Sequence, residues 1–128
     1  MMQKVFKQMA YLFRPTLQKD LYITKDLGVQ DSTTPWVPQN NINLTKIKIK
    51  SYTTPTGTGS TTLRIYKNKG ESNETVLCDL VLNSSTIEAE TGSGFHEEII
   101  SGSKITYSIT TVTSVHPGSD AIISFMYL

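Results

Sequence analysis

The sequence has one cysteine, no long hydrophobic run and almost no net charge. Its 12 Lys and Arg residues against 11 Asp and Glu give a formal net charge of +1 over 128 residues. A dedicated nucleic-acid binder would show a strong basic excess for its phosphate contacts, so this balance argues against that class. Cys78 alone excludes an intramolecular disulfide framework and the multi-cysteine zinc motifs. Because no run of about 18 apolar residues occurs, we expect no membrane span.

Alanine is scarce, and the hydroxyl-bearing residues take its place. The chain has 3 alanines, but 13 serines and 18 threonines. β-Branched residues fit the pleated surface of a strand, whereas helices favour Ala, Leu and Glu. A chain of this length buries enough surface for one core. The composition therefore predicts a single domain that is mainly β-structure.

The N-terminal segment is the one stretch with a helical pattern. Its large apolar residues recur at spacings of three and four and end before Pro15; they are Met2, Val5, Phe6, Met9, Leu12 and Phe13. We expect residues 1–18 to form an amphipathic helix or arm that packs on this domain or on a neighbouring subunit. The partner-binding residues would be Val5, Phe6, Met9 and Phe13.

Two alternatives for the N-terminal segment are weaker. A membrane-surface helix would carry more basic residues than Lys4, Lys7 and Arg14. A secretion signal would need a longer apolar run than residues 9–13 and a small-residue cleavage site after it. We therefore expect no secretion signal.

From residue 19 onward, short apolar runs alternate with segments rich in Gly, Pro, Asn, Ser and Thr. This pattern is typical of a β-sandwich or barrel. About eight strands are predicted, over residues 21–27, 42–52, 61–67, 75–82, 86–90, 95–100, 104–112 and 120–128. The expected fold of residues 19–128 is an all-β, jelly-roll-like antiparallel sandwich.

The second predicted strand has two different faces. Lys46, Lys48 and Lys50 share one face, and Ile47 and Ile49 share the other. The lysines form a positive row that either meets an acidic partner or is an ordinary solvated face. Upstream in this strand, a leucine at position 44 is out of phase with the isoleucines, which predicts a β-bulge near residue 45.

The residues that often carry catalysis occur here without their usual partners. His96 lies in a Phe-His-Glu-Glu sequence, but position 100 is Ile100 and not a second histidine, so the metalloprotease motif is incomplete. His116 precedes Pro-Gly and is best interpreted as a turn residue. Cys78 shares a predicted strand face with Val76 and two leucines, which indicates a buried thiol. We predict no catalytic, metal-binding or cofactor-binding residues.

Trp36, the only tryptophan, lies in a loop between two prolines. An aromatic ring there either closes one end of the sandwich or stacks on a sugar ring or a partner. The glycine- and threonine-rich loop over residues 54–60 is expected to be flexible. Closing the sandwich is the favoured interpretation; in the alternative one, this loop and residues 91–94 would join Trp36 in a glycan contact.

The last third of the chain carries a recognisable pattern. It consists of Ser-Gly-Ser-Lys and an alternating strand over residues 101–109, Pro-Gly-Ser-Asp over 117–120, and an alternating strand over 122–127. With the Trp-Val-Pro segment at 36–38 and the strand at 43–52, this resembles the small β-sandwich modules of bacteriophage virion proteins. Those modules occur in capsid decoration proteins, head fibres and tail-fibre or baseplate tips. The pattern departs from theirs at Gly102-Ser103, where Gly-Asp is usual, and at Ala121-Ile122.

The resemblance implies a non-enzymatic module, displayed on a virion and often oligomeric. The first hypothesis is a capsid auxiliary, decoration or head-fibre component, anchored by its arm to the major capsid protein, to tail or portal components or to sister subunits. The alternative is a tail-fibre or baseplate module that contacts host-surface glycan. A carbohydrate-binding domain that accompanies an enzyme is a third possibility.

The net charge of +1 conceals two opposite halves. Residues 1–70 hold 11 basic and 3 acidic residues, a net +8, whereas residues 71–128 hold 1 basic and 8 acidic residues, a net −7. Early and late strands of a jelly roll share sheets, so the halves either neutralise each other or leave a dipolar molecule suited to assembly.

Overall fold

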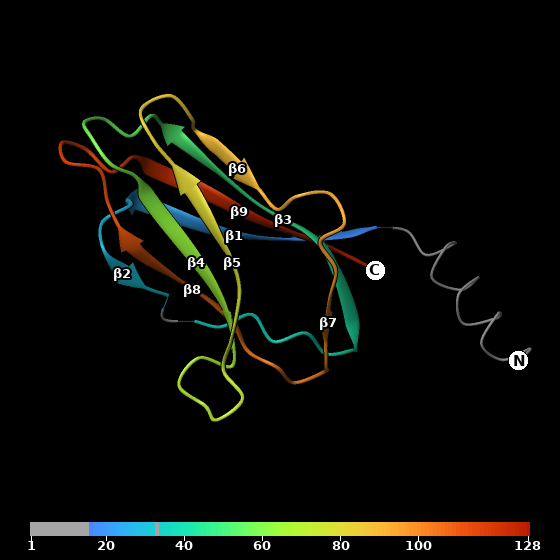
Figure 1. Ribbon diagram of the computed structural model, residues 1–128. Helices are drawn as coiled ribbons and strands as arrows, with labels where there is room; N and C mark the ends of the chain where they lie inside the picture. Colours follow the sequence, from blue (N-terminus) through green and yellow to red (C-terminus); the bar gives the residue numbers. More distant parts are fainter. Residues whose placement is uncertain (1–15, 33) are drawn as a thin grey trace, which may run out of the picture.

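The computed structural model describes residues 16–32 and 34–128, which form nine β-strands (Figure 1). No helix occurs in these residues, so none of them could form a membrane-spanning helix. The strands are β1 (Leu17–Asp26), β2 (Gln30–Asp31), β3 (Ile42–Thr53), β4 (Thr61–Lys67), β5 (Thr75–Leu82), β6 (Glu88–Glu90), β7 (Glu97–Ile99), β8 (Ile105–Thr111) and β9 (Ser119–Tyr127).

The strands build two sheets that pack face to face. One has the order β1-β9-β3-β6, with β7 also paired to β3, and the other has the order β2-β8-β4-β5. All pairs are antiparallel, and they are nested: β1 pairs with β9, β2 with β8, β3 with β6 and β7, and β4 with β5. If β6 and β7 count as one interrupted strand, this is the eight-strand pairing of a jelly roll. The predicted all-β sandwich is confirmed.

The core lies between the sheets because both contribute alternate apolar side chains. In the first sheet, Ile47 and Ile49 of β3 and Phe125 of β9 are buried. In the second, Leu63 of β4 and Ile109 of β8 face them in the same cluster. β9 lies between β1 and β3, so its side chains form the centre of that layer.

The β-bulge expected near residue 45 is present. In the pairing of β3 with β9, Leu44 lies opposite Tyr127 and Lys46 lies opposite Met126, so Thr45 is the extra residue. The Thr45 hydroxyl donates a hydrogen bond to the Met126 carbonyl oxygen at 3.2 Å. The bulge allows both Leu44 and Ile47 to be buried, which removes the conflict in phase.

Several strand bounds differ from the sequence-based expectation. β1 begins at Leu17, within the segment expected to be the arm, because its first residues pair with the end of β9. β2 lies between the strands expected at residues 21–27 and 42–52, where no strand was predicted. The two strands near residues 86–100 are shorter than expected, with three residues each.

The expectation that Val76 lies on a buried face is wrong. Cys78 pairs with Ile65, whereas Val76 pairs with Tyr66, the next residue of β4, so β5 has an extra residue at Leu77. This bulge turns Val76 outward, and 47% of its surface is exposed.

Candidate functional site

The predicted partner-binding residues of the arm, Val5, Phe6, Met9 and Phe13, lie outside the described residues. The described chain begins at Thr16 and enters β1 at Leu17. Leu17 pairs with Tyr127, near the end of β9. The arm therefore joins the sandwich at the end of the molecule that also carries the C-terminus (Figure 1).

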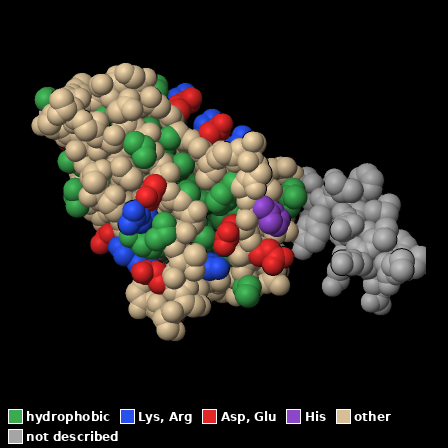
Figure 2. Space-filling model, viewed as in Figure 1, with side chains coloured by type: hydrophobic (Ala, Val, Ile, Leu, Met, Phe, Trp, Pro, Cys, Tyr) green, Lys and Arg blue, Asp and Glu red, His purple; other side chains and the backbone are tan. Residues whose placement is uncertain are grey.

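The predicted lysine row lies on the outer face of β3, next to an acidic strand. Lys46 forms an ion pair with Glu90 and Lys50 forms one with Glu88, each with a nitrogen–oxygen distance of 3.5 Å. Lys48 lies between them, directly opposite Glu90. Figure 2 shows basic and acidic side chains alternating along the edge where β6 lies. The row is therefore partly neutralised within the molecule, although exposed pairs of this kind contribute little stability.

Trp36 packs at the end of the sandwich. Its backbone exchanges hydrogen bonds with Ile105, at 2.9 and 2.8 Å. The indole ring lies 5.1 Å from the ring of Phe125 and 5.4 Å from that of Tyr127, measured between centroids, and both contacts are tilted. Such geometry is favourable for aromatic pairs. The ring also borders an open pocket of about 680 Å³, lined by Leu17, Val37, Pro38, Gln39, Asn40, Asn41, Ile42, Tyr127 and Leu128. A glycan contact of Trp36 stays a prediction.

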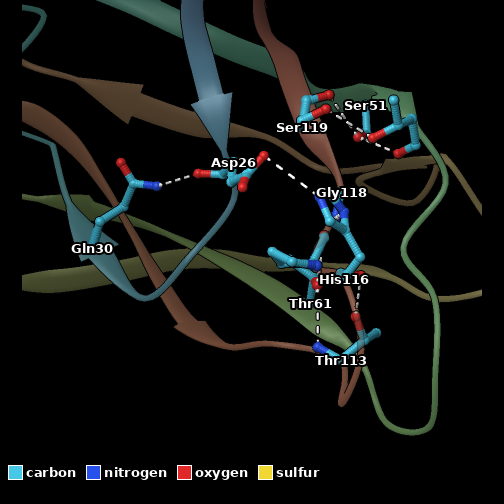
Figure 3. A network of polar contacts seen from close by, with 10 residues as sticks. Asp26, Gln30, Ser51, Thr61, Thr113, His116, Gly118 and Ser119 are labelled. Carbon is cyan, nitrogen blue, oxygen red and sulfur yellow. Dashed lines mark hydrogen bonds and ion pairs between the residues drawn. The ribbon is translucent and has the colours of Figure 1, made fainter.

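His116 belongs to a network of polar contacts at the opposite end (Figure 3). The backbone N–H of Gly118 donates to its Nδ1 at 3.1 Å, which places the proton of the neutral ring on Nε2. Nε2 lies 3.5 Å from the Asp26 carboxylate. The Thr113 hydroxyl donates to the His116 carbonyl oxygen at 2.6 Å. These contacts join β1 to the segment between β8 and β9.

The loop over residues 54–60 is held in place by the same segment. Thr56 N–H donates to the His116 carbonyl at 2.8 Å, and Thr58 N–H donates to the Ser114 hydroxyl at 2.9 Å. Gly57 has a φ of 97°, and a Cβ there would lie 2.4 Å from the Ser114 Oγ. The loop expected to be flexible is therefore hydrogen-bonded and tightly packed.

A serine, a lysine and an aspartate meet on the outer side of the second sheet. The Lys69 ammonium donates to the Asp31 carboxylate and to the Ser108 hydroxyl, both at 2.8 Å. Ser108 donates to the same carboxylate oxygen at 2.5 Å. The hydrogen bond from Lys69, followed by that from Ser108, lowers the pKa of Asp31.

This cluster does not have the arrangement of a catalytic dyad. Ser108 is buried, and its hydroxyl donates to a carboxylate while it accepts from the ammonium of Lys69. A nucleophilic serine would need to give its proton to a base and reach a substrate. The cluster instead ties β2 to β8 and to the turn after β4. No local sequence pattern could have revealed it, because its members are far apart in the chain.

A groove on the outer face of the first sheet was also missed. It has a volume of about 250 Å³ and lies between Tyr22 of β1 and Tyr52 of β3, over Ile122 of β9. Lys50 and Asp120 also border it, but its lining is almost entirely apolar. The available signal was that Tyr52 is in phase with the lysines of β3, which places an aromatic ring on the solvent face.

Comparison with known proteins finds a shared fold but no family. No family model and no curated protein matches the chain. The fold is similar to a chain in the acidic stable capsid structure of Helicobacter pylori bacteriophage KHP30, with a TM-score of 0.55 and 9% identity over 88% of this chain and 92% of that one. The likeness shows the fold alone.

Two further structures are more distant. One is a chain of the disulfide-linked pili that form Bacillus endospore appendages, with a TM-score of 0.40 and 13% identity over 88% of this chain and 85% of that one. The other is a chain of the virus-like particle of the extra small virus of the prawn Macrobrachium rosenbergii, with a TM-score of 0.28 and 12% identity over 89% and 79%.

Cys78 and His96, the remaining candidates for a nucleophile or a metal ligand, have no catalytic or metal-binding partners among the described residues. Burial raises the pKa of the Cys78 thiol to about 12, so the sulfur stays protonated near neutral pH. His96 is exposed and directly precedes β7. Among the described residues, no three His, Cys, Asp or Glu side chains form a group that could hold a metal ion.

Proposed function

We propose that this chain is a non-enzymatic structural protein of a phage virion, namely a capsid auxiliary, decoration or head-fibre component. The observation that supports it is the jelly-roll topology, shared with a chain of a phage capsid structure. Jelly rolls also occur in lectins and cupins, so the proposal draws in addition on the side chains. The protonated thiol of Cys78 and the buried hydroxyl of Ser108 are poor starting points for catalysis.

The N-terminal arm would attach the protein to the shell or to sister subunits. Because the chain enters the sandwich beside Trp36, attachment by the arm would direct that end toward the shell. The opposite end, with His116 and the loop over residues 54–60, would then face outward. A side contact to a neighbouring subunit or the major capsid protein would involve Lys46, Lys48 and Lys50. In this contact, acidic groups of the neighbour would replace Glu88 and Glu90 as the partners of the lysines.

Removal of the arm tests the anchoring. A variant lacking residues 1–15 keeps β1 complete and should fold, as measured by circular dichroism, but should be absent from purified particles. Two full-length variants form a matched pair. The first combines Val5→Ser, Phe6→Ser, Met9→Ser and Phe13→Ser, and the control combines Gln3→Ser and Gln8→Ser. The first should lose incorporation and the second should keep it. Normal incorporation of the truncated chain would contradict the arm's role.

A second candidate is a receptor-binding module of a tail fibre or baseplate. It is favoured by the pocket beside Trp36, where Gln39, Asn40 and Asn41 offer amide groups to sugar hydroxyls. Electron microscopy of labelled protein on purified particles separates this candidate from the first, since a label on the tail would replace the proposed position on the head.

A further inference from the structure

The groove on the outer face of the first sheet is built from large apolar side chains that remain open to solvent. Tyr22 of β1 is 64% exposed, Tyr52 of β3 is 82% exposed and Ile122 of β9 is 40% exposed. Ile122 lies opposite Tyr22 in one strand pairing and opposite Lys50 in the other, so it forms the floor between the two tyrosines. Exposed apolar side chains gathered in one groove indicate a contact surface.

The apolar surface continues from this groove along β9. Ile123 and Phe125 are buried in the core, so the alternation of the strand places Ile122 and Met126 together on the outer face. Four residues of extended strand, about 13 Å, separate these two side chains. Only Ser124 lies between them on this face. A partner that covers the face must therefore present an apolar stripe of similar length.

The N-terminal arm carries an apolar stripe of this length. The residues of its predicted helical face that are expected to bind a partner are Val5, Phe6, Met9 and Phe13. Eight helical steps from the first to the last of them span about 12 Å. With the period of a helix, the basic residues of the arm fall on the opposite face, where they would stay in water. Helices of this kind dock into apolar grooves through side chains spaced three and four residues apart.

The volume of the groove suits an aromatic side chain of such a helix. A cavity of about 150 Å³ holds benzene, so a groove of about 250 Å³ takes one phenyl ring and the end of an aliphatic side chain beside it. Phe6 would fill the groove with Met9 beside it. Phe13, two helical turns or about 11 Å from Phe6, would then reach Met126.

We propose that this groove receives the N-terminal arm of a second copy of the chain. The chain's own arm leaves the sandwich at Leu17, about 17 Å along β1 from Tyr22, and the direction of β1 leads it away from the groove. A return would need a reversal within Pro15 and Thr16, which alone separate the predicted helix from β1. The arm of a neighbouring copy needs no such reversal. Reciprocal exchange of arms between two copies would close a dimer.

Self-association of the full-length chain tests the inference and is measured by sedimentation equilibrium. The groove variant combines Tyr22→Ser and Tyr52→Ser, and the arm variant combines Phe6→Ser and Phe13→Ser. Each should weaken self-association about 10-fold or more, because each removes two apolar side chains from the contact. Since the two tyrosines are largely exposed, the groove variant should keep the circular dichroism spectrum of the unaltered chain.

A matched control changes apolar side chains on the outer face of the other sheet. Val76 and Val81 of β5 are both exposed there. The variant that combines Val76→Ser and Val81→Ser should associate as strongly as the unaltered chain.

Mixing the groove variant with the arm variant separates exchange between copies from contact within one copy. The intact arm of the groove variant should enter the intact groove of the arm variant, so the mixture should associate although neither variant does so alone. This association should be weaker than that of the unaltered chain, because each pair has one arm contact in place of two. Recovery in the mixture would also show that the changed residues did not unfold either variant.

The salt dependence identifies the kind of contact. An apolar contact should persist or strengthen at high salt, whereas association through the oppositely charged halves of the chain should weaken.

Four results would overturn the inference. They are an unaltered chain that is monomeric at micromolar concentration, a groove variant that associates as strongly as the unaltered chain, a mixture that stays monomeric, and association that high salt abolishes.

This inference rests on the proposed role of the arm as an attachment segment and names the site that it binds. The two fail in different ways. If the arm variant is absent from particles while the groove variant keeps both self-association and incorporation, the arm binds another virion protein, and only the inference fails. If the groove variant and the arm variant lose self-association and complement each other, but the unaltered chain is absent from particles, the inference holds and the proposed function fails.

Discussion

Lys69 joins three segments that are distant in the sequence. Its ammonium group contacts Asp31 and Ser108 and also lies 4.7 Å from the centre of the Tyr66 ring. Lys69→Met should lower the free energy of unfolding at neutral pH by less than about 1 kcal/mol, because the carboxylate of the Lys69–Asp31 ion pair is exposed to solvent. Urea denaturation of the variant and the unaltered chain measures the difference.

The pH dependence of that difference identifies its origin. Since the pKa of Asp31 is lowered in the folded chain, its contribution is complete above the unfolded value of 3.8 and is lost as the pH falls through the lower folded value. The gap between Lys69→Met and the unaltered chain should therefore narrow in strong acid. A gap that stays constant down to the lowest measurable pH would show that Lys69 acts by packing rather than by charge.

Individual strands show how far the sequence predicts this fold. β4 and β5 have the predicted bounds, and the bulge at Thr45 follows from the phase of the apolar residues. β2 was missed because it has only two polar residues, and it forms through pairing with the distant β8. The outward turn of Val76 depends on a bulge that no local pattern marks. Likewise, Tyr22 and Tyr52 border one groove only because β9 lies between their strands.

The loop over residues 54–60 gives a prediction for a connecting element. Gly57→Ala would place a Cβ 2.4 Å from Ser114 Oγ and 2.7 Å from the Val115 backbone nitrogen. Gly59→Ala is the matched control, because Gly59 also has a positive φ of 81° but nothing lies within 4 Å. Thermal unfolding should show a cost of about 1 kcal/mol for Gly59→Ala and a further 1–3 kcal/mol or so for Gly57→Ala. Equal costs would mean that the loop is not packed as described.

At the scale of the whole molecule, the two charge halves neutralise each other through the topology. β3, from the basic half, lies beside β6 from the acidic half, which forms the Lys46–Glu90 and Lys50–Glu88 pairs. On the second sheet, Arg64 binds Asp79 through two hydrogen bonds of 2.8 and 3.0 Å, and this contact lowers the pKa of Asp79. The jelly roll thus brings together strands of opposite charge, and the cationic half has fewer free charges for an acidic partner than the sequence predicted.

A charge exchange tests whether this neutralisation matters for the folded chain. Lys50→Glu should destabilise it, because three acidic side chains would then lie together on β3 and β6, and salt should reduce the loss. Adding Glu88→Lys should restore most of the stability, with a coupling energy of about 0.2–1 kcal/mol in the double-mutant cycle. Urea denaturation at low and high salt measures the free energy of unfolding of four proteins, namely the unaltered chain, Lys50→Glu, Glu88→Lys and the double variant. A coupling energy of zero at low salt would mean that the halves are neighbours without being energetically linked, and the opposite charges would then remain available for contacts between molecules.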